Sequence, residues 1–390
     1  MDNVRKLDIK GRNKKKKTSI KRKKIKMKNI DYSLLCAIVV LLFIGIVMVY
    51  SSSSYYALYQ EDVWNSDHYF TKEIIWTVVG IIGMIVTMSI DYHTYKKWTP
   101  WLVIITIGLL VLVLFLGADI NGARRWIRLG GLSLQPSELA KYVVVLYLAL
   151  LIDKRRGKIK EFKGGTLYYL AIAAVFAGLI ILEKNLSITA IVMMVSFIMI
   201  LVGGAKLSHL FSLIPIGLSA GLGLIFMESY RLQRLTSFLD PWADPSGDSY
   251  QLIQSLYALG SGGLFGVGLG NSRQKALFMP EPHNDFIFAI IGEELGLIGC
   301  VAIISIFIFI VIKGTSIAVK ARDNYGYLLA IGIISVIAIQ AIINIAVVTG
   351  SMPVTGVPMP LISYGGTSLV FNLCAIGILL NISRQSKEDI

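Results

Sequence analysis

Long apolar runs recur along almost the whole chain, and they restrict its possible folds more than any other feature. Hydrophobic residues make up 55% of the 390 positions and charged residues 16%, whereas a soluble domain has roughly 45–50% apolar and about 25% charged residues. A water-soluble chain of this length has no core large enough to bury so much apolar surface. The composition therefore predicts a multi-pass membrane protein and excludes a soluble enzyme, a nucleic-acid-binding domain and a disordered chain.

A helix needs about 20 mainly apolar residues to cross the hydrocarbon core of a bilayer. The candidate spans in this sequence are residues 34–51, 74–90, 101–118, 136–152, 167–182, 187–203, 208–226, 286–312, 326–348 and 365–383. We therefore expect an all-α protein with ten transmembrane helices. No internal repeat is apparent, which gives no support to an inverted-repeat transporter.

The distribution of Lys and Arg predicts the orientation of these spans, because cytoplasmic loops are enriched in both. If the N-terminus is inside, the basic loops containing Lys96, Lys206 and residues 154–163 and 313–322 all lie on the cytoplasmic side. The C-terminal tail, residues 384–390, adds two more basic residues on that side. We therefore expect both termini to be cytoplasmic.

Residues 1–33 form a basic tail in front of the first span. Residues 1–30 contain 14 Lys and Arg against two Asp, and so carry +12 of the formal net charge of +14. The first aromatic residue is Tyr32, so the tail lacks the stacking residues of single-strand nucleic-acid binders. We expect a disordered cytoplasmic arm at anionic lipid headgroups, where each basic residue contributes about 1 kcal/mol; nucleic-acid binding is the less favoured alternative.

Two outer loops break the charge rule. One is residues 118–135, and the other is the large extracellular loop at about 227–284, within the ten-helix domain at 34–383. Their basic residues are Arg124, Arg125, Arg128, Arg231, Arg234, Arg273 and Lys275. Outside a bacterial membrane, an anionic lipid headgroup or a pyrophosphate is a natural partner for them. The alternative is that they extend from helix ends to phospholipid.

Ionisable residues near the ends of spans are functional candidates, because unpaired charge in lipid is costly. Glu138 and Lys141 are three residues apart and share a helix face. They form either a structural ion pair or an outward-facing charge site in which Glu138 orients Lys141. Asp285 begins a span, where it is either a helix N-cap or a functional carboxylate. Glu293 and Glu294 lie two turns deeper and are expected to pair inside the bundle.

The outer segments also carry structural signals. Residues 250–255 are amphipathic and are predicted to lie at the membrane interface. The glycine-rich residues 260–270 lack the strand–helix context of a nucleotide site, and are predicted to form a close-packed or flexible loop over a cavity. Residues 349–360 contain three prolines and no charge. Non-helical backbone near a membrane is tolerated when it lines a cavity, so a cavity wall is expected there. The cysteines and histidines show no metal-ligand spacing.

Several long motifs resemble the SEDS (shape, elongation, division and sporulation) family of cell-wall polymerases, and the resemblance covers nearly the whole chain after the tail. The motifs are NGARRWIRLGGLSLQPSELAK at 121–141, DPWADPSGDSYQLIQSLYALGSGGLFGVGLGNSRQK at 240–275, PEPHNDFIFAIIGEELG at 280–296 and the segment 349–367. The RQK sequence ending at Lys275 and the sequence INIAVVTGSMPVTG from Ile343 are more similar to the FtsW/SpoVE branch than to the RodA branch.

This resemblance implies a SEDS fold and a peptidoglycan glycosyltransferase that polymerises lipid II outside the membrane and releases undecaprenyl pyrophosphate. It also implies a class B penicillin-binding protein as the transpeptidase partner, with other divisome proteins, at the division or sporulation septum of a bacterial cell membrane. The aspartate of the family's DFIF motif is essential and corresponds to Asp285, which as a general base would take the proton of the acceptor hydroxyl.

The departing pyrophosphate needs positive charge, which basic side chains or a divalent cation such as Mg2+ or Mn2+ would supply. No cofactor and no metal ligand is assigned from the motifs. The substrate-binding residues expected from them are Arg125, Trp126, Glu138, Lys141, Arg231, Arg234, His283, Ser363 and Tyr364.

The sequence departs from the family pattern in two places. Where many members have Pro-Asp-Leu-Gly-Thr after the fifth span, this chain has Lys184-Asn185-Leu186-Ser187-Ile188, without the carboxylate. Ser133 stands where some division-branch members have arginine. Two other functions are less favoured by the sequence. A lipid II flippase would need a polar path across the membrane, whereas the basic clusters here lie outside. An ion-coupled transporter is disfavoured by the absence of repeats.

Overall fold

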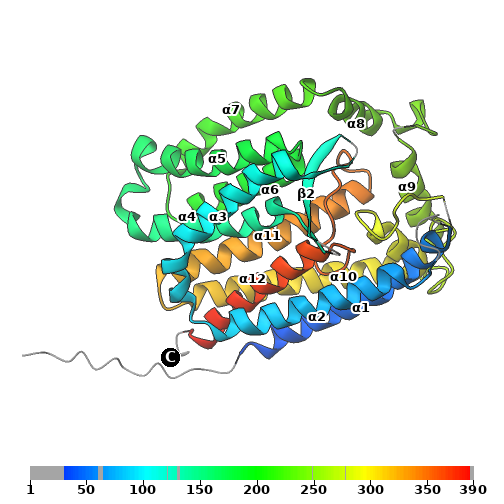
Figure 1. Cartoon of the computed structure of the whole chain (residues 1–390), viewed down its shortest axis with the longest axis horizontal. Coiled ribbons are helices and arrows are strands. Elements are labelled where there is room, and N and C mark those ends of the chain that lie inside the picture. The colour runs from blue at the N-terminus through cyan, green and yellow to red at the C-terminus, as the bar shows by residue number, and fades with distance from the viewer. Residues whose placement is uncertain are drawn as a thin grey trace, which may run out of the picture.

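The computed structural model describes residues 30–59, 65–120, 122–129, 132–247, 249–276 and 278–386. Most of these residues form long helices that lie side by side in one bundle (Figure 1). The predictions for the basic tail concern residues 1–29, which lie outside the described part of the chain, as do residues 387–390.

Ten helices coincide with the ten predicted spans: α1 (Tyr32–Tyr59), α2 (His68–Ser89), α3 (Tyr95–Leu116), α4 (Pro136–Lys154), α5 (Tyr168–Leu182), α6 (Leu186–Val202), α7 (Leu207–Phe226), α10 (Ile287–Val319), α11 (Asn324–Val348) and α12 (Gly366–Arg384). Within the described ranges, eight of them are long and apolar enough to cross a membrane. The other two are α4, which contains charged residues, and α6, which has 17 residues. The prediction of a multi-pass membrane protein is confirmed.

The helices differ in how much of their surface the protein itself covers. The apolar windows of α11 and α12 are 72% and 78% buried, whereas that of α7 is 6% buried. Most side chains of α4 are buried as well. Helices α4, α11 and α12 therefore form the centre of the bundle. Helix α7 lies at its periphery, as Figure 1 shows, and exposes an almost wholly apolar surface suited to lipid.

The expectation of an all-α fold misses a small antiparallel sheet between α3 and α4. Its strands are β1 (Ala118–Ile120), β2 (Ala123–Leu129) and β3 (Leu132–Leu134), in the order β1-β2-β3. Gly122 has φ of 73° in the turn between β1 and β2, a conformation that glycine adopts without steric cost. In β2, Ala123 and Ile127 are buried while Arg124 and Arg128 are exposed, and the third basic residue, Arg125, is half-buried. Because side chains alternate along a strand, Arg125 lies on the side of Ala123 and Ile127.

Two further helices lie in the large outer loop: α8 (Ser229–Leu239) and α9 (Tyr250–Gly262). The amphipathic run at 250–255 is the start of α9, and its apolar residues Leu252 and Ile253 are buried against the protein. The prediction that this run lies on the membrane is therefore wrong, because its apolar face is already covered by the bundle.

The glycine-rich segment packs against a break in α10. Gly296 has φ of 68° inside that helix. The amide of Leu297 bonds to the Gly263 carbonyl at 2.9 Å, and the amide of Val267 bonds to the Glu293 carbonyl at 2.9 Å. The segment thus supplies hydrogen bonds that the broken helix lacks. It is close-packed as expected, but it does not line the cavity described below.

Glu293 and Glu294 pair inside the bundle, as predicted. The ammonium of Lys275 lies 2.6 Å from Glu294 Oε1, and the Ser51 hydroxyl donates to the same carboxylate. Glu293 accepts a hydrogen bond from the hydroxyl of Ser272. These contacts fasten the outer loop to α1 and α10 and leave neither carboxylate available as a partner for Asp285.

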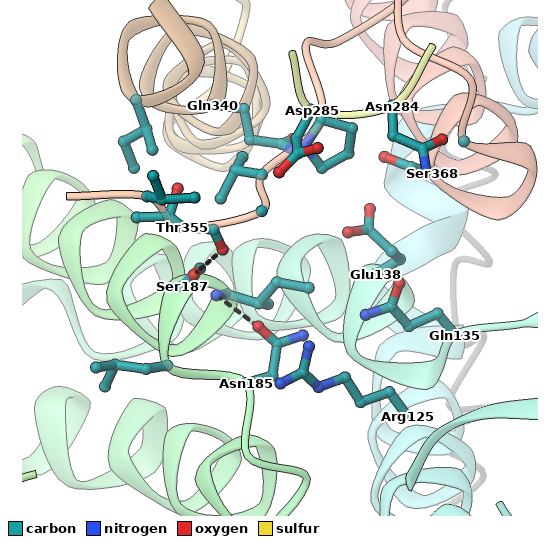
Figure 2. Close-up of a pocket in the computed structure, with 18 of the residues that line it drawn as sticks. Arg125, Gln135, Glu138, Asn185, Ser187, Asn284, Asp285, Gln340, Thr355 and Ser368 are labelled. Carbon is teal, nitrogen blue, oxygen red and sulfur yellow. Dashed lines mark hydrogen bonds between the residues drawn. The ribbon is translucent and has the colours of Figure 1, made fainter. Parts of the chain in front are cut away.

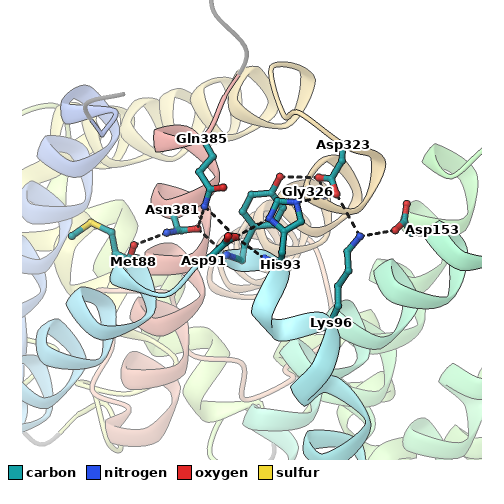
Figure 3. A network of polar contacts seen from close by, with 10 residues as sticks. Met88, Asp91, His93, Lys96, Asp153, Asp323, Gly326, Asn381 and Gln385 are labelled. Carbon is teal, nitrogen blue, oxygen red and sulfur yellow. Dashed lines mark hydrogen bonds and ion pairs between the residues drawn. The ribbon is translucent and has the colours of Figure 1, made fainter. Parts of the chain in front are cut away.

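A polar network joins the opposite ends of the helices (Figure 3). Lys96 lies 2.8 Å from Asp153 and 3.4 Å from Asp323, and the Tyr92 hydroxyl donates to Asp323 at 2.8 Å. Asn381 of α12 donates to the Met88 carbonyl of α2 at 2.7 Å. These contacts connect α2, α3, α4, α11 and α12 at the ends remote from the cavity.

Candidate active site

A cavity of about 860 Å³ opens where the N-terminal ends of α4, α6 and α12 meet the segment before α10. Strand β2, helix α8 and residues 352–358 complete its walls. This confirms the expectation that the proline-containing segment forms a cavity wall. In Figure 2, Asp285, Asn284 and Gln340 lie on one side of the cavity and Arg125 and Asn185 on the other, with Glu138 between them.

Asp285 lines the cavity without capping a helix. Helix α10 begins at Ile287, its N-cap position is Phe286, and no side chain caps it. The Asp285 backbone is held by Asn344, whose amide donates to the carbonyls of Asp285 at 2.7 Å and Val357 at 2.8 Å. Asn344 thereby joins the start of α10 to the wall across from it. The local geometry thus favours the functional alternative for Asp285 over the capping alternative.

Burial raises the pKa of the Asp285 carboxyl to about 6. The carboxylate of Glu281 raises it further, whereas the guanidinium of Arg234 acts in the opposite direction. Glu281 is fixed by Asn284, whose side-chain amide lies 2.6 Å from Glu281 Oε2. A carboxylate with a pKa near 6 is ionised at neutral pH, yet is a stronger base than a solvated aspartate.

Glu138 and Lys141 form the predicted ion pair, with 2.8 Å between Lys141 Nζ and Glu138 Oε2. Both side chains are buried, but only Glu138 lines the cavity. Lys141 therefore lies behind Glu138, where it compensates the carboxylate charge.

A basic wall faces Asp285. Its members are Lys72, Arg125, Arg128, Lys184, Arg231 and Arg234. Three of these cations are oriented by backbone carbonyls. Arg125 bonds to Lys184 O at 2.6 Å, Arg231 to Leu224 O at 2.8 Å and Arg234 to Val354 O at 3.2 Å. Because a guanidinium has five N–H donors, each of the three retains donors for an anion.

The remaining expected site residues divide into two groups. Trp126 and Tyr364 line the cavity. His283 and Ser363 are buried beside it and are absent from its walls. The centre of the His283 ring lies 4.1 Å from that of the Tyr69 ring. The backbone carbonyl of His283 accepts a hydrogen bond from the Tyr364 amide at 3.0 Å. Burial lowers the pKa of His283 to about 3, so its ring is neutral and packs the Asp285-bearing segment in place.

Several cavity residues were not among the expected ones: Lys184, Asn185, Glu281, Asn284, Gln340 and Ser368. Gln340 could have been predicted from the sequence, because it is a polar residue inside an otherwise apolar span. A side-chain amide there is costly unless it has a hydrogen-bond partner or faces a cavity. Glu281 and Asn284 lie within the DFIF-containing motif. Lys184 and Asn185 were recognised only as a departure from the family pattern.

The described residues contain no group of three or more His, Cys, Asp or Glu side chains that could hold a metal ion. Three carboxylates line the cavity, and two of them are engaged, Glu138 by Lys141 and Glu281 by Asn284, which leaves Asp285 alone as a potential ligand. The donor set therefore does not fit a metal bound mainly by protein ligands, and the charge available for a pyrophosphate is that of the basic wall.

Comparison with known proteins places this arrangement in a family. The family model described as "Cell cycle protein", which represents FtsW, RodA and SpoVE, matches residues 32–388. The chain belongs to the FtsW/RodA/SpoVE family. The resemblance inferred from the motifs is thereby confirmed.

Two relatives match this family member over nearly their full lengths. Stage V sporulation protein E of Bacillus subtilis (strain 168) is 44% identical over 361 residues, which are 92% of this chain and 98% of that protein. Probable peptidoglycan glycosyltransferase FtsW of Geobacter sp. (strain M18) is 40% identical over 360 residues, 92% of this chain and 97% of that protein.

The fold of this FtsW/RodA/SpoVE member also matches a solved structure. That structure is described as "Structural coordination of polymerization and crosslinking by a peptidoglycan synthase complex". The similarity has a TM-score of 0.75 at 24% sequence identity, and it covers 92% of this chain and 99% of the other.

Proposed function

We propose that this chain is a peptidoglycan glycosyltransferase that joins lipid II units into glycan strands on the outer face of a bacterial cell membrane. The observation that carries the proposal is the cavity in which Asp285, with a pKa of about 6, faces a wall of basic residues. The relative named as a probable peptidoglycan glycosyltransferase supports the same activity over 92% of this chain.

In this proposal Asp285 is the general base of an inverting displacement. The acceptor sugar hydroxyl lies beside the carboxylate and attacks the anomeric carbon of the donor, and its proton passes to Asp285. The bond between the anomeric carbon and the phosphate oxygen breaks as the glycosidic bond forms. The leaving group is undecaprenyl pyrophosphate, whose developing negative charge is stabilised by preorganised cations.

The predicted substrate-binding residues have different parts in this reaction. Arg125, Arg231 and Arg234 bind the pyrophosphate, and Trp126 and Tyr364 contact the sugar or peptide at the cavity surface. Glu138 contacts the substrate directly, and Lys141 maintains the charge of Glu138 from behind. His283 and Ser363 act as positioning residues for the segments that carry Asp285 and Tyr364.

The proposal includes ten crossings with both termini in the cytoplasm. The eight helices of sufficient length and apolarity support it, and α4 and α6 complete the count because they lie among the other spans. The basic loops at residues 154–163 and 313–322 then lie inside. With this orientation the cavity opens to the outer face, where lipid II is polymerised.

We also propose a class B penicillin-binding protein as partner, at a division or sporulation septum together with other divisome proteins. The similar solved structure belongs to a complex that coordinates polymerization and crosslinking, which supports a transpeptidase partner. The relatives named FtsW and Stage V sporulation protein E support the septal assignment.

The proposed activity is tested with labelled lipid II and the purified protein in detergent, with and without the transpeptidase. We expect glycan strands in the presence of the partner. A flippase-only function predicts none, because a detergent micelle has no bilayer for lipid II to cross. Absence of strands from a stable, correctly assembled complex would contradict the proposed function.

A further inference from the structure

The turn between α5 and α6 has a strained backbone at a charged residue. Helix α5 ends in a Schellman arrangement, in which the Asn185 amide bonds to the Ile180 carbonyl at 3.2 Å and the Lys184 amide bonds to the Ile181 carbonyl at 2.8 Å. The first residue after the helix cap in this motif, which donates the second of these bonds, adopts the left-handed conformation and is usually glycine. Here it is Lys184, with φ of 58°.

Such strain is rare in the described part of the chain and is concentrated at the cavity. Three non-glycine residues there have φ in the left-handed region, namely Lys184, Glu281 and Leu361. Lys184 and Glu281 both line the cavity. Strained residues persist only when the surrounding structure holds them in place, and they cluster at functional sites. A glycine or asparagine would form the α5–α6 turn with less strain than lysine.

The surroundings hold the α5–α6 turn firmly. The Lys184 carbonyl accepts from Arg125 Nη2 at 2.6 Å and from the Tyr230 hydroxyl at 3.0 Å. Asn185 caps α6 by accepting from the Ile188 amide at 3.2 Å, and the Ser187 hydroxyl donates to the Thr355 carbonyl at 2.7 Å. Figure 2 shows these last two contacts at the cavity wall.

The side chain of Lys184, in contrast to its backbone, is not engaged. Its ammonium has no hydrogen-bond or ion-pair partner among the described residues, whereas Arg125, Arg231 and Arg234 each bond to a backbone carbonyl. Among the described residues, the cavity carboxylate Glu138 pairs with Lys141, and neither Glu281 nor Asp285 forms an ion pair with Lys184. Lys184 thus adds an unpaired positive charge to the cavity wall that also carries Arg125.

We propose that Lys184 is a substrate-binding residue whose ammonium binds the diphosphate of the lipid-linked donor. This inference rests on the proposed function. Arg125 and Tyr230 hold the α5–α6 turn at the cavity wall, where Lys184 is an exposed lining residue. In this proposal the lysine side chain reaches the diphosphate from that wall, and the strain is the consequence of placing a cation at a position suited to glycine. The chemical class recognised is a pyrophosphate ester.

The test separates strain from charge with three variants of the purified complex. Lys184→Gly and Lys184→Asn both suit the left-handed conformation and remove the charge, whereas Lys184→Arg retains it. We expect Gly and Asn to raise the thermal midpoint slightly. We also expect them to raise the apparent KM for lipid II by about tenfold, the effect of losing one hydrogen bond from a charged group. Lys184→Arg should keep the KM within about threefold of wild type, although its geometry differs.

Inorganic pyrophosphate is the second probe, as an inhibitor of glycan synthesis. Lys184→Gly and Lys184→Asn should weaken its inhibition by about the same factor as they raise the KM. Arg273→Gln is the control, because Arg273 is an exposed cation in the loop before α10 and does not line the cavity. It should leave the KM and the pyrophosphate inhibition unchanged.

Wild-type KM and wild-type pyrophosphate inhibition in both charge-removing variants would overturn the proposal. A lower turnover with those two quantities unchanged would also overturn it, because it would place Lys184 in a different step. Failure of the proposed function itself has a different signature, since the wild-type complex would then produce no glycan from lipid II.

Discussion

Asp285 and Glu183 are two acidic residues at the cavity end of the molecule whose pKa values are raised by burial, to about 6 and about 8. Near neutral pH the first is therefore ionised and the second protonated. A protonated Glu183 leaves the charge of the neighbouring Arg125 uncompensated, which suits an anion-binding wall. The ionised Asp285 is available to accept a proton.

The pH dependence of the reaction follows from the pKa of Asp285. If this carboxylate is the general base, glycan synthesis should fall as pH decreases through about 6, with one proton taken up. The pH profile of kcat for the purified complex measures this. An acidic limb near the ordinary aspartate pKa of 3.8, or no acidic limb at all, would contradict the assignment of Asp285 as base.

The same pKa predicts a change in stability. Because the folded state holds the Asp285 proton more tightly than the unfolded chain, the free energy of unfolding should decrease as pH rises from about 4 to about 6, and this contribution should remain unfavourable above pH 6. Asp285→Asn removes the cost of burying the charge. Its thermal midpoint above pH 6 should therefore equal or exceed that of the wild type.

Lys141 offers a second prediction at the scale of single residues. Lys141→Met leaves the buried Glu138 carboxylate unpaired, which costs about 3–5 kcal/mol of stability. We expect a lower thermal midpoint and lower activity, with Lys141→Arg less affected because the charge remains.

The double variant Glu138→Gln with Lys141→Met separates the two roles, because it removes both charges. It should recover most of the stability but not the activity if Glu138 contacts substrate. Wild-type kinetics in Lys141→Met would show that the pair has no part in the reaction.

Among single residues, the predictable ones lie in a family motif and carry a charge whose placement near lipid costs free energy. Asp285 and Glu138 are charged residues at the ends of apolar spans, and the structure brings them to one cavity with four of the predicted loop arginines, Arg125, Arg128, Arg231 and Arg234, but not with Arg124 or Arg273. Lys184 could not be predicted as a cavity residue, because its position depends on Arg125 and Tyr230, which are distant in the sequence. His283 and Ser363 belong to the right motifs, but their side chains are buried behind the wall.

At the scale of elements, the break in α10 is the feature that most depends on one residue. A Cβ at Gly296 would lie 2.4 Å from the Gly266 amide nitrogen and 2.6 Å from the Leu264 carbonyl oxygen. Both contacts are with backbone, so the clash cannot be relieved by a side-chain movement. Gly296→Ala should therefore destabilise the protein by at least about 2 kcal/mol, from left-handed strain together with the clash.

Gly178→Ala in α5 is the matched control, because no atom lies within 4 Å of the added Cβ. It should be neutral or stabilising by up to about 1 kcal/mol. Thermal unfolding of the two variants in detergent measures the difference. Equal midpoints would mean that the contact between the glycine-rich segment and α10 contributes little to stability.

The helices were predictable from the sequence because each depends on a local run of apolar residues. The sheet was not, since β1 and β3 have three residues each and are formed by pairing across turns. The break at Gly296 was missed for the same reason. The break depends on backbone hydrogen bonds between α10 and residues 263–268. The pattern of apolar residues within α10 does not reveal these bonds.

At the scale of the whole molecule, one end of the helix bundle is crosslinked by polar contacts and the opposite end contains the cavity. The network that contains Asp323 joins five helices, whereas the opposite ends of the helices surround the cavity. This division allows the substrate site to be open while the helix bundle remains fixed. The basic tail precedes α1 on the inner side in the proposed orientation.

The tail is predicted to act separately from the reaction. Deleting residues 1–30 removes 14 basic residues and should weaken attraction to anionic vesicles, since each contributes about 1 kcal/mol near the surface. Glycan synthesis by the truncated complex in detergent should be largely unchanged. Complete loss of synthesis in a correctly folded truncation would show that the tail takes part in catalysis or assembly.

The central claim is that Asp285 is the base of a lipid II polymerase, and Asp285→Asn tests it most directly. Asparagine has nearly the same volume and disturbs no helix cap, because no side chain caps α10. The measurement is glycan synthesis from labelled lipid II by the purified complex, beside its thermal midpoint. The account predicts a rate lower by about 10²–10⁴-fold, with a midpoint no lower than that of the wild type. An Asp285→Asn enzyme that polymerises lipid II at the wild-type rate would contradict it.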